Sequence, residues 1–478
     1  MRKILKNTLD YLESRVDYAD IRFVDNDRET IEVENGILSA YNISNNRGVG
    51  IRVLVNGAWG FASTNNLNKE SLLETAEQSL KIAMASSLIK KEDIRLAREE
   101  RHVDSYTTPI VMDPFKVNPE KKIELLVRAT RRMLKDKVKK SEGILDFYKT
   151  HKLFLSTEGS EIKQTIIESG GGITAHAIEE GEFQTRSYPA SFGGDYATSG
   201  YEFIEKIKLL ENAERIAHEA NELLVAPPCP EGSTDIVIGG SQLALQVHES
   251  CGHPVELDRV LGKELSYAGG SFLTLDKLNH FSYGSPLVNI TADATLPKGL
   301  GTFGFDDEGV PAGRTFLVKR GKFTGYLTSR EDAFKLGQKS NGTARAESWN
   351  RIPLIRMTNI NLLPGNFNLN ELIGDIKNGL FLDYNKSWSI DDKRLNFQFG
   401  TELAREIKNG KLGKIFKNAI YQGITPEFWH ACDGISNEKY WHTWGVANCG
   451  KGQPGQTMHV GHGTSPARFR NIKVGASK

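Results

Sequence analysis

Hydrophobic and polar residues along the first hundred positions follow two periods, one typical of helices and one of strands. Residues 2–16 have the pattern of an amphipathic helix, and residues 48–61 form an apolar, β-branched run between glycines that favours strands. The pairs Asn35-Gly36 and Asn56-Gly57 are typical of two-residue hairpin turns, because both residue types tolerate a positive φ. Residues 69–86 then predict a long helix. Its apolar stripe consists of Leu72, Ala76, Leu80 and Ala83.

A second unit repeats the combination of strands and long helices. Asn118-Pro119 supplies a helix cap and a first-turn proline, so residues 121–136 are predicted to be helical. Strand patterns follow between residues 143 and 191, and a further helix is predicted over residues 202–224. The similarity between the two units is too weak at the level of single residues to establish a duplication.

A proline-rich segment divides the chain. Residues 226–233 (APPCPEGS) have no periodicity and are predicted to be a linker between an N-terminal α+β domain (1–225) and a C-terminal domain (234–478). Residues 1–100 and 110–225 are candidate subunits of the first domain. The C-terminal domain is β-rich with short helices, so the predicted fold class is α+β. Its turn and short-helix signals are Arg320-Gly321, Asn409-Gly410 and residues 331–336, 370–378 and 426–431.

Composition narrows the class of protein. The chain has 478 residues, of which 39% are hydrophobic and 25% charged, as in a globular protein with a substantial core. The net charge of +1 argues against a nucleic-acid partner. No run approaches about 18 apolar residues, and the start lacks the features of a secretory signal, so we expect a cytoplasmic protein without a membrane span. Four cysteines are too few for a disulfide framework, which favours a ligand or nucleophile role for any special cysteine.

The clearest chemical motif follows the linker. Residues 234–240 predict a buried strand, and Ser241 is a candidate cap for a helix that carries HESCGH, in which His248 and His253 enclose Glu249. This HExxxH pattern is similar to the HExxH of zinc peptidases with one residue inserted. Two histidines on one helix therefore become candidate metal ligands, although packing alone also explains such a pair.

The inserted residue has a geometric consequence. Positions five apart lie about 140° apart around an ideal α-helix, so the two imidazoles would not converge on one ion. We therefore expect the helix to widen by a π-type turn or to unwind at Gly252, and Pro254 prevents its regular continuation.

A catalytic zinc site usually has three protein ligands and one open position, so a third ligand is needed. Cys449 lies in a glycine-flanked segment that predicts an accessible turn. Cys251 competes with it, because it follows His248 by three residues on the same helical face. His459 and His462 are a candidate second metal pair or simply flank strand ends. Two cysteines are interpreted as ordinary buried thiols: Cys229 and Cys432.

At this point the sequence resembles the TldD/PmbA family of metallopeptidases, in particular its TldD-like branch. The resemblance covers nearly the whole chain. The segments that carry it, in order, are YADIRFVDNDRETIEVENGILSAYNISNNRGVGIRVLVNGAWGFASTNNL, HESCGHPVELD, TFGFDDEGVPAGRTFLVKRGKFTGYLTSREDAFKLG, RMTNINLLPG and GVANCGKGQPGQTMHVGHG.

The resemblance implies that His248, His253 and Cys449 bind Zn²⁺ and that Glu249 is catalytic. PmbA-like relatives lack these ligands, so their presence places this chain on the active branch. The resemblance also implies hydrolysis of unfolded polypeptides or peptides, and a homodimer or a heterodimer with a PmbA-like paralogue.

Further roles are predicted for neighbouring residues. Glu256 or Asp258 is expected to orient His253, because ligating imidazoles usually donate their second N–H to a carboxylate or carbonyl. Three arginines are candidates for anchoring a peptide carboxylate: Arg345, Arg351 and Arg356.

Two other functions compete with peptide hydrolysis. One is a non-hydrolytic protein with a structural metal that modulates a topoisomerase or a toxin–antitoxin complex. The other is a redox or metal-storage protein that uses Cys251 and Cys449. An intact Glu249 beside a ligand favours hydrolysis, because a structural metal site has no use for it.

Overall fold

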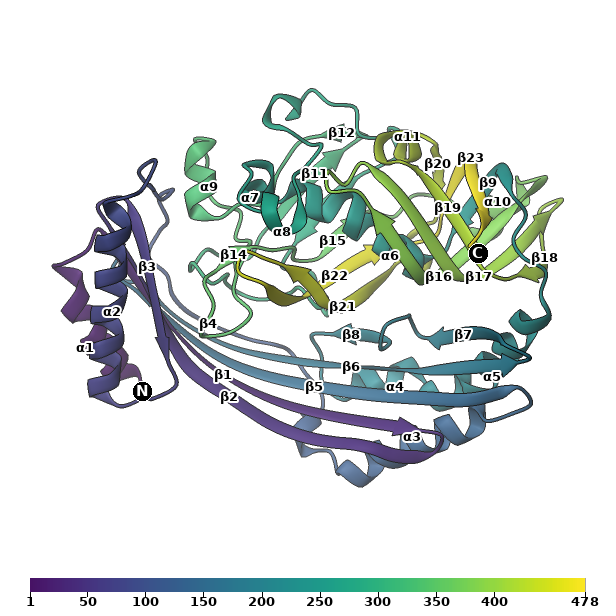
Figure 1. The fold of residues 1–478 in the computed structure, drawn as a ribbon, viewed down its shortest axis with the longest axis horizontal. Coiled ribbons are helices and arrows are strands. Elements are labelled where there is room, and N and C mark those ends of the chain that lie inside the picture. Colours follow the sequence, from purple (N-terminus) through teal and green to yellow (C-terminus); the bar gives the residue numbers. More distant parts are fainter. Residues whose placement is uncertain (478) are drawn as a thin grey trace.

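A computed structural model describes residues 1–477, and its fold is mixed α+β, as predicted. The N-terminal half is built on a long curved sheet with the order β3-β2-β1-β5-β6-β4, to which β7 and β8 are added along β6. The C-terminal half lies on the concave side of this sheet (Figure 1). The strands of the sheet are β1 (Tyr18–Glu34), β2 (Ile37–Val55), β3 (Ala58–Thr64), β4 (Val103–Thr107), β5 (Val138–Ser156), β6 (Glu161–Glu179), β7 (Glu182–Tyr188) and β8 (Asp195–Ala197).

The helices of this half cover the curved sheet at its two ends (Figure 1). One cluster of buried side chains joins α1 and α2 to β1 and β2, and another joins α3 and α5 to β5 and β6. Lys208 has a φ of 50° and divides the single helix predicted over 202–224 into two. The helices are α1 (Arg2–Glu13), α2 (Lys69–Ser87), α3 (Pro119–Met133), α4 (Glu202–Ile207) and α5 (Leu209–Val225).

Both predicted Asn-Gly hairpins are present. Asn35-Gly36 joins β1 to β2, and Asn56-Gly57 joins β2 to β3. All four residues have positive φ, between 46° and 76°, which is the conformation that this turn type requires.

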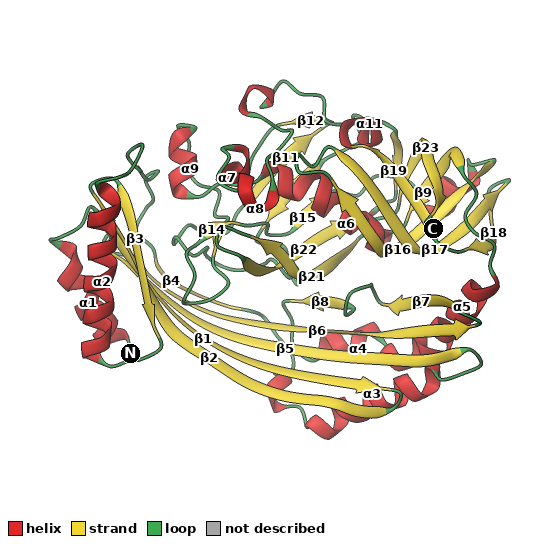
Figure 2. Cartoon of the chain, in the orientation of Figure 1, coloured by secondary structure: helices red, strands yellow, loops and turns green. Residues whose placement is uncertain are grey.

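The C-terminal half is dominated by strands (Figure 2). Its main sheet has the order β16-β9-β23-β19-β17-β18, with β20 paired to β23, and a second sheet has the order β12-β11-β10-β15. Two hairpins complete it, β13-β14 and β21-β22. The strands are β9 (Gly232–Ile238), β10 (Ile290–Asp293), β11 (Arg314–Lys319), β12 (Lys322–Phe323), β13 (Ala344–Arg345), β14 (Leu354–Ile355), β15 (Ile360–Leu362), β16 (Asn378–Ile390), β17 (Asn396–Lys408), β18 (Lys411–Phe416), β19 (Ala419–Ile424), β20 (Cys432–Ile435), β21 (His442–Lys451), β22 (Gln456–Thr464) and β23 (Ala467–Ala476).

One helix crosses the middle of this half, and its apolar side chains enter the largest buried cluster, together with residues of β9, β16 and β23. That helix is α6, and five shorter helices lie around it. Their bounds are α6 (Gly240–Val247), α7 (Leu257–Val260), α8 (Leu265–Ala268), α9 (Arg330–Lys335), α10 (Leu369–Gly374) and α11 (Thr425–His430). In residues 1–477, no helix combines the length and apolar character that a membrane crossing requires.

The start of α6 differs from the prediction. Ser241 does not cap the helix but lies inside it, and its Oγ donates to the Asp383 carboxylate on β16 at 2.9 Å. The same carboxylate accepts the backbone N–H of Gln242 at 3.3 Å. Because a carboxylate from a neighbouring strand supplies the acceptor, the helix begins before Ser241 without a side-chain cap of its own.

Candidate metal centre

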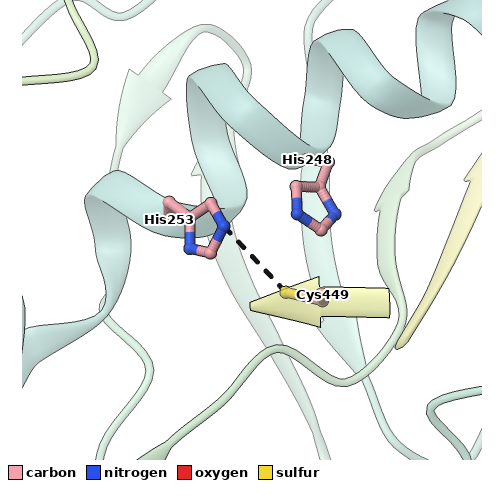
Figure 3. A group of neighbouring side chains, drawn as sticks. All are labelled: His248, His253 and Cys449. Atoms are coloured by element: carbon pink, nitrogen blue, oxygen red, sulfur yellow. Dashed lines mark hydrogen bonds between the residues drawn. The ribbon is translucent and has the colours of Figure 1, made fainter. Parts of the chain in front are cut away.

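The helix that carries the HExxxH motif widens where the inserted residue requires it. After α6, residues His248–Gly252 form a π-helical turn, in which the backbone N–H of His253 donates to the carbonyl of His248. A 3₁₀ turn, His253–Val255, follows and contains Pro254. The expected widening is therefore present, and it turns both imidazoles toward the same side of the helix (Figure 3).

The two imidazoles meet a sulfur from another part of the chain. Cys449 lies on β21 and faces the widened turn (Figure 3). One donor atom each of His248, His253 and Cys449 lies within 4.8 Å of the others, and all three side chains are buried. The Cys449 Sγ is 3.9 Å from the His253 Nε2. Tetrahedral zinc bonds of ordinary length would bring a nitrogen and a sulfur to about 3.6 Å, so the cluster has the size of a metal site.

Hydrogen bonds determine which imidazole nitrogen of His248 is available. Its Nδ1 lies 2.8 Å from the Nε2 of His462, and the Nδ1 of His462 lies 3.3 Å from the carbonyl of Ile360. A carbonyl only accepts, so His462 donates through Nδ1 and accepts through Nε2. His248 must then donate through Nδ1, which leaves the lone pair of its Nε2 free.

His253 is oriented in a parallel way. Its Nδ1 lies 3.0 Å from the Glu256 Oε2, so the Nδ1–H donates to the carboxylate and the Nε2 lone pair faces the Cys449 sulfur. Burial lowers the pKa of His248 below its ordinary value, and lowers the pKa of His253 and of His462 well below theirs. Neutral imidazoles are the form that binds metal.

Cys449 is not in the free turn that its flanking glycines predicted. It lies on β21 in the β21-β22 hairpin, where the pairing is irregular between Val446 and Cys449. Such a bulge redirects a side chain without ending the strand. Burial by itself raises the pKa of the thiol, but the Arg356 guanidinium and His253 outweigh it, so the pKa of Cys449 is lowered.

Cys251 differs from Cys449 in its charged neighbours. Both side chains belong to the large apolar cluster, but at Cys251 burial dominates and raises the pKa of the thiol to about 12. It is not part of the three-residue group found among the described residues. Cys229 and Cys432 are also buried and free, and burial raises the pKa of each thiol to about 12.

Glu249 reaches a cavity beside the cluster. The cavity has a volume of about 290 Å³ and is lined by His248, His253, Cys449 and Glu249, together with residues of both halves. The Oε2 of Glu249 accepts a hydrogen bond from the Nη1 of Arg394 at 2.6 Å. Sequence reasoning missed Arg394, because nothing around it marks a contact with a helix so far away in the chain.

The two predicted orienting carboxylates have different partners. Glu256 contacts His253, whereas both carboxylate oxygens of Asp258 accept from the Lys451 Nζ, at 2.7 and 2.9 Å. Asp258 therefore neutralises a buried lysine and has no hydrogen bond to His253 in the described structure.

None of the three arginines predicted to anchor a carboxylate lines the cavity. Arg345 donates to the carbonyls of Met357 and His459, and Arg356 donates to the carbonyl of Cys449 at 2.5 Å. Arg351 lies 3.9 Å from the carboxylate of Glu347. Arg345 and Arg356 thus fix the backbone around the cluster.

The two histidines of the candidate second metal pair do not lie together. His459 and His462 are three residues apart on β22, so they point to opposite faces of the hairpin. His459 lies 2.8 Å from the Glu168 carboxylate of the N-terminal sheet, while His462 contacts His248. His462 is therefore a partner of the first site rather than part of a second one.

Two buried histidines of a widened helix and a buried cysteine of β21 define a candidate metalloenzyme of mixed α+β fold. The chain belongs to the PmbA/TldD family: the family's models for domain 1, the central domain and the C-terminal domain of PmbA/TldA metallopeptidases match residues 19–83, 113–226 and 231–476.

Relatives and solved structures resemble the chain over almost its full length. Metalloproteases of Methanothermobacter thermautotrophicus and Methanocaldococcus jannaschii are 32% and 30% identical to it. These alignments cover 98% of the chain and 97% of the first relative, and 94% of the chain and of the second. A metalloprotease named as a TldD homologue from Haemophilus influenzae is 28% identical, over 99% of the chain and 96% of the relative.

Two solved structures show the same fold at lower identity. A Thermotoga maritima protein described as a candidate modulator of a DNA gyrase has a TM-score of 0.78 at 20% identity, with 99% of each chain covered. TldE from Thermococcus kodakarensis has a TM-score of 0.73 at 16% identity, with 98% of this chain and 99% of that one covered.

Proposed function

We propose that this protein is a zinc-dependent metallopeptidase that hydrolyses unfolded polypeptides or peptides. The observation that carries the proposal is the convergence of two imidazole nitrogens with free lone pairs and one thiol beside a cavity that Glu249 lines. Membership in a metallopeptidase family and curated relatives named as metalloproteases support it.

The donor set fits zinc. Two neutral imidazoles and one thiolate are common zinc ligands, and three protein ligands leave a coordination position for substrate or water. His248, His253 and Cys449 would hold the ion. When bound there, zinc supplies Lewis acidity, which polarises a carbonyl and lowers the pKa of a water to about 7.

The residues around the cluster have separate tasks. Glu249 accepts a proton from the attacking water and passes it to the nitrogen of the leaving amine. His462 and Glu256 hold the two imidazoles in the required tautomers, because each accepts the N–H that would otherwise face the ligand position. Arg345 and Arg356 keep the Cys449 segment in place through backbone carbonyls.

The proposal extends to the substrate and the assembly. The cavity lies where the two halves meet and has a volume of about 290 Å³, which suits an extended chain better than a folded domain. We propose domains at 1–225 and 234–478 joined by 226–233, acting in the cytoplasm as a homodimer or with a PmbA-like paralogue. The fold shared with TldE is compatible with pairing of two related chains.

Glu249→Gln tests the reaction. The amide keeps the shape of the side chain but does not accept the proton, so we expect full zinc content and a loss of casein cleavage of about 10²–10⁴-fold. Cleavage that survives in this variant would reject Glu249 as the base. A protein that only binds a macromolecular partner would show no dependence of its activity on Glu249.

Cys449→Ala and Cys251→Ala test the ligand set as a matched pair of thiol deletions. We expect zinc to be lost from the first and retained by the second, as measured by metal analysis of the purified proteins. Zinc retained in Cys449→Ala would reject the proposed ligand.

A further inference from the structure

Arg394 lies at the tip of the hairpin that joins β16 to β17, and its backbone is held in an uncommon conformation. Its φ is 63°, which non-glycine residues adopt rarely. The turn is fixed from both sides: the Arg394 N–H donates to the Asp391 carbonyl at 2.8 Å, and Thr425 Oγ1 donates to the Arg394 carbonyl at 3.0 Å. Strain that the surroundings maintain is a frequent sign of function.

The guanidinium group contacts one oxygen of Glu249 and leaves the other free. Nη1 donates to Oε2 at 2.6 Å, and the two side chains are 16% and 7% exposed. The second oxygen, Oε1, accepts no hydrogen bond from the described residues. It is not fully closed off from solvent. Both residues line the cavity beside the metal cluster.

We propose that Arg394 is a positioning residue for Glu249, an inference that rests on the proposed function. It holds the carboxylate by Oε2, so that Oε1 stays directed to the cavity and can take the proton of the attacking water. Glutamate has several rotatable bonds, and a base that is misplaced by about 1 Å loses much of its rate advantage. An orienting partner behind the base is a recurrent arrangement in enzymes.

The proton balance is complete without Arg394. The proton leaves the water, binds Oε1 of Glu249, and is transferred to the nitrogen of the leaving amine as the C–N bond breaks. Arg394 neither gives nor takes a proton in these steps. Its task is therefore geometric.

A purely structural role for the pair does not explain its placement. The hairpin tip is already fixed by the Asp391 carboxylate, which accepts the N–H groups of Leu395 and Asn396. A buried ion pair adds little net stability compared with an apolar pair of similar volume, although removing only one partner is costly. The contact therefore serves to orient the Glu249 carboxylate and is not required to fix the hairpin.

Arg394→Ala, Arg394→Lys and Lys393→Ala test the proposal, with Lys393→Ala as the matched control because it removes an exposed cation from the same turn. In Arg394→Ala we expect wild-type zinc content, a kcat for casein-derived peptides lowered about 10- to 1,000-fold, and KM within about 3-fold. Arg394→Lys should recover part of kcat, and so should guanidinium ion added to Arg394→Ala below denaturing concentration. Lys393→Ala should behave as wild type.

The outcomes separate this inference from the proposed function. If the wild type cleaves through Glu249 but Arg394→Ala keeps its kcat, or loses kcat without any recovery by lysine or guanidinium, the positioning role is rejected and the peptidase stands. If Arg394→Ala does not fold, the Arg394→Lys comparison decides in the same way. A wild type that does not cleave at all overturns both.

A separate observation concerns the mouth of the same cavity. Phe192, in the loop before β8, is 53% exposed and has a φ of 58°, and Trp388 on β16 is 45% exposed. Their rings meet edge to face, with centroids 5.3 Å apart, and both line the cavity. Large aromatic side chains that stay exposed beside reactive groups have apolar surface left to bury.

We also infer that Phe192 and Trp388 form the subsite for a bulky apolar side chain of the peptide, again given the proposed function. Matched peptides that carry Phe or Ala at one position test this. We expect the wild type to favour Phe by about 10-fold or more in kcat/KM, and Phe192→Ala and Trp388→Ala to lose that preference while still cleaving the Ala peptide. A preference that neither variant changes would reject the subsite without affecting the peptidase.

Discussion

Buried polar groups are paired differently in two regions of the molecule. One region is the interface between the two halves, and the other is the cavity beside the His-His-Cys cluster. At the interface, Arg52 contacts both Asp20 and Glu308, and Arg186 contacts both Glu219 and Glu402. Neither guanidinium leaves a buried nitrogen without a partner. In the cavity, by contrast, the His248 Nε2 and the Glu249 Oε1 have no hydrogen-bond partner among the described residues, and the Cys449 Sγ lies 3.9 Å from the His253 Nε2.

This difference distinguishes the buried polar groups that can bind a ligand from those that cannot. These two guanidinium groups link the halves and have no buried donor left for a ligand. The cluster keeps lone pairs free because second partners, His462 and Glu256, take up the N–H groups on the far side of each imidazole. Stability and metal affinity should therefore respond to different substitutions.

The largest effect should come from the interface. Arg186 is fully buried, so Arg186→Ala leaves two buried carboxylates, Glu219 and Glu402, without their shared cation. We expect the free energy of unfolding in urea at neutral pH to fall by about 3–5 kcal/mol. Arg215→Ala is the control, because this half-exposed arginine contacts the same Glu219 and should cost less than about 1 kcal/mol. Zinc affinity of the folded protein should not change in either.

Gly252→Ala should disturb both properties, because this glycine lies in the widened turn. A Cβ there would lie 2.2 Å from the sulfur of Met357, which is fully buried. We expect a loss of about 1–3 kcal/mol in unfolding free energy from overpacking, and weaker zinc binding because the turn shifts. Gly374 lies at the end of α10 with open space around it, so Gly374→Ala should change neither the unfolding free energy nor zinc binding. Partial recovery in Gly252→Ala/Met357→Ala would confirm the cause.

His462→Ala should weaken zinc binding in addition to the loss of stability expected for any truncated buried side chain. Without the acceptor for the His248 Nδ1–H, we expect the dissociation constant for zinc to rise about 10- to 100-fold in competition with a chelator. His459→Ala on the same strand removes an imidazole that points to the other face, and its zinc affinity should match the wild type. Equal effects in the two variants would contradict the assignment of His462.

The last effect is confined to one range of pH and concerns Glu264, a buried carboxyl near Lys451. Burial raises its pKa to about 7, whereas an unfolded glutamate has a pKa of about 4.3. The folded state therefore binds the extra proton, and stability declines as the pH rises from about 4.3 to 7. Glu264→Gln should remove this decline and raise the unfolding free energy at pH 8 on the order of 2 kcal/mol. If the unfolding free energy changes by the same amount between pH 5 and pH 8 in the wild type and in Glu264→Gln, this prediction is contradicted.

Local patterns predicted much of this molecule. The Asn-Gly pairs predicted the first two hairpins. The spacing of His248 and His253 predicted either a widened turn or an unwound one at Gly252, and the structure has the widened turn. The α+β class and the β-rich C-terminal half also followed from periodicity.

Features that depend on contacts between distant segments could not be predicted from local sequence patterns. Ser241 looked like a cap because the Asp383 carboxylate that replaces it comes from another strand. Cys449 looked like a turn residue because a bulge in a paired strand has no strong local signal. His462 was considered only as part of a second metal pair or as a residue flanking a strand end, because its contact with His248 joins distant segments, and Arg394 had no signal at all.

The position of β23 has a consequence for how the protein is made. This strand lies in the interior of the main C-terminal sheet, between β9 and β19, although β9 precedes it by most of that half. During synthesis on the ribosome, β9 and the HExxxH helix emerge long before their neighbours, and pairings of such long range close slowly. Cys449 and His462 emerge in the same late stretch as β23. The nascent chain therefore lacks a complete ligand set until its sheet can close.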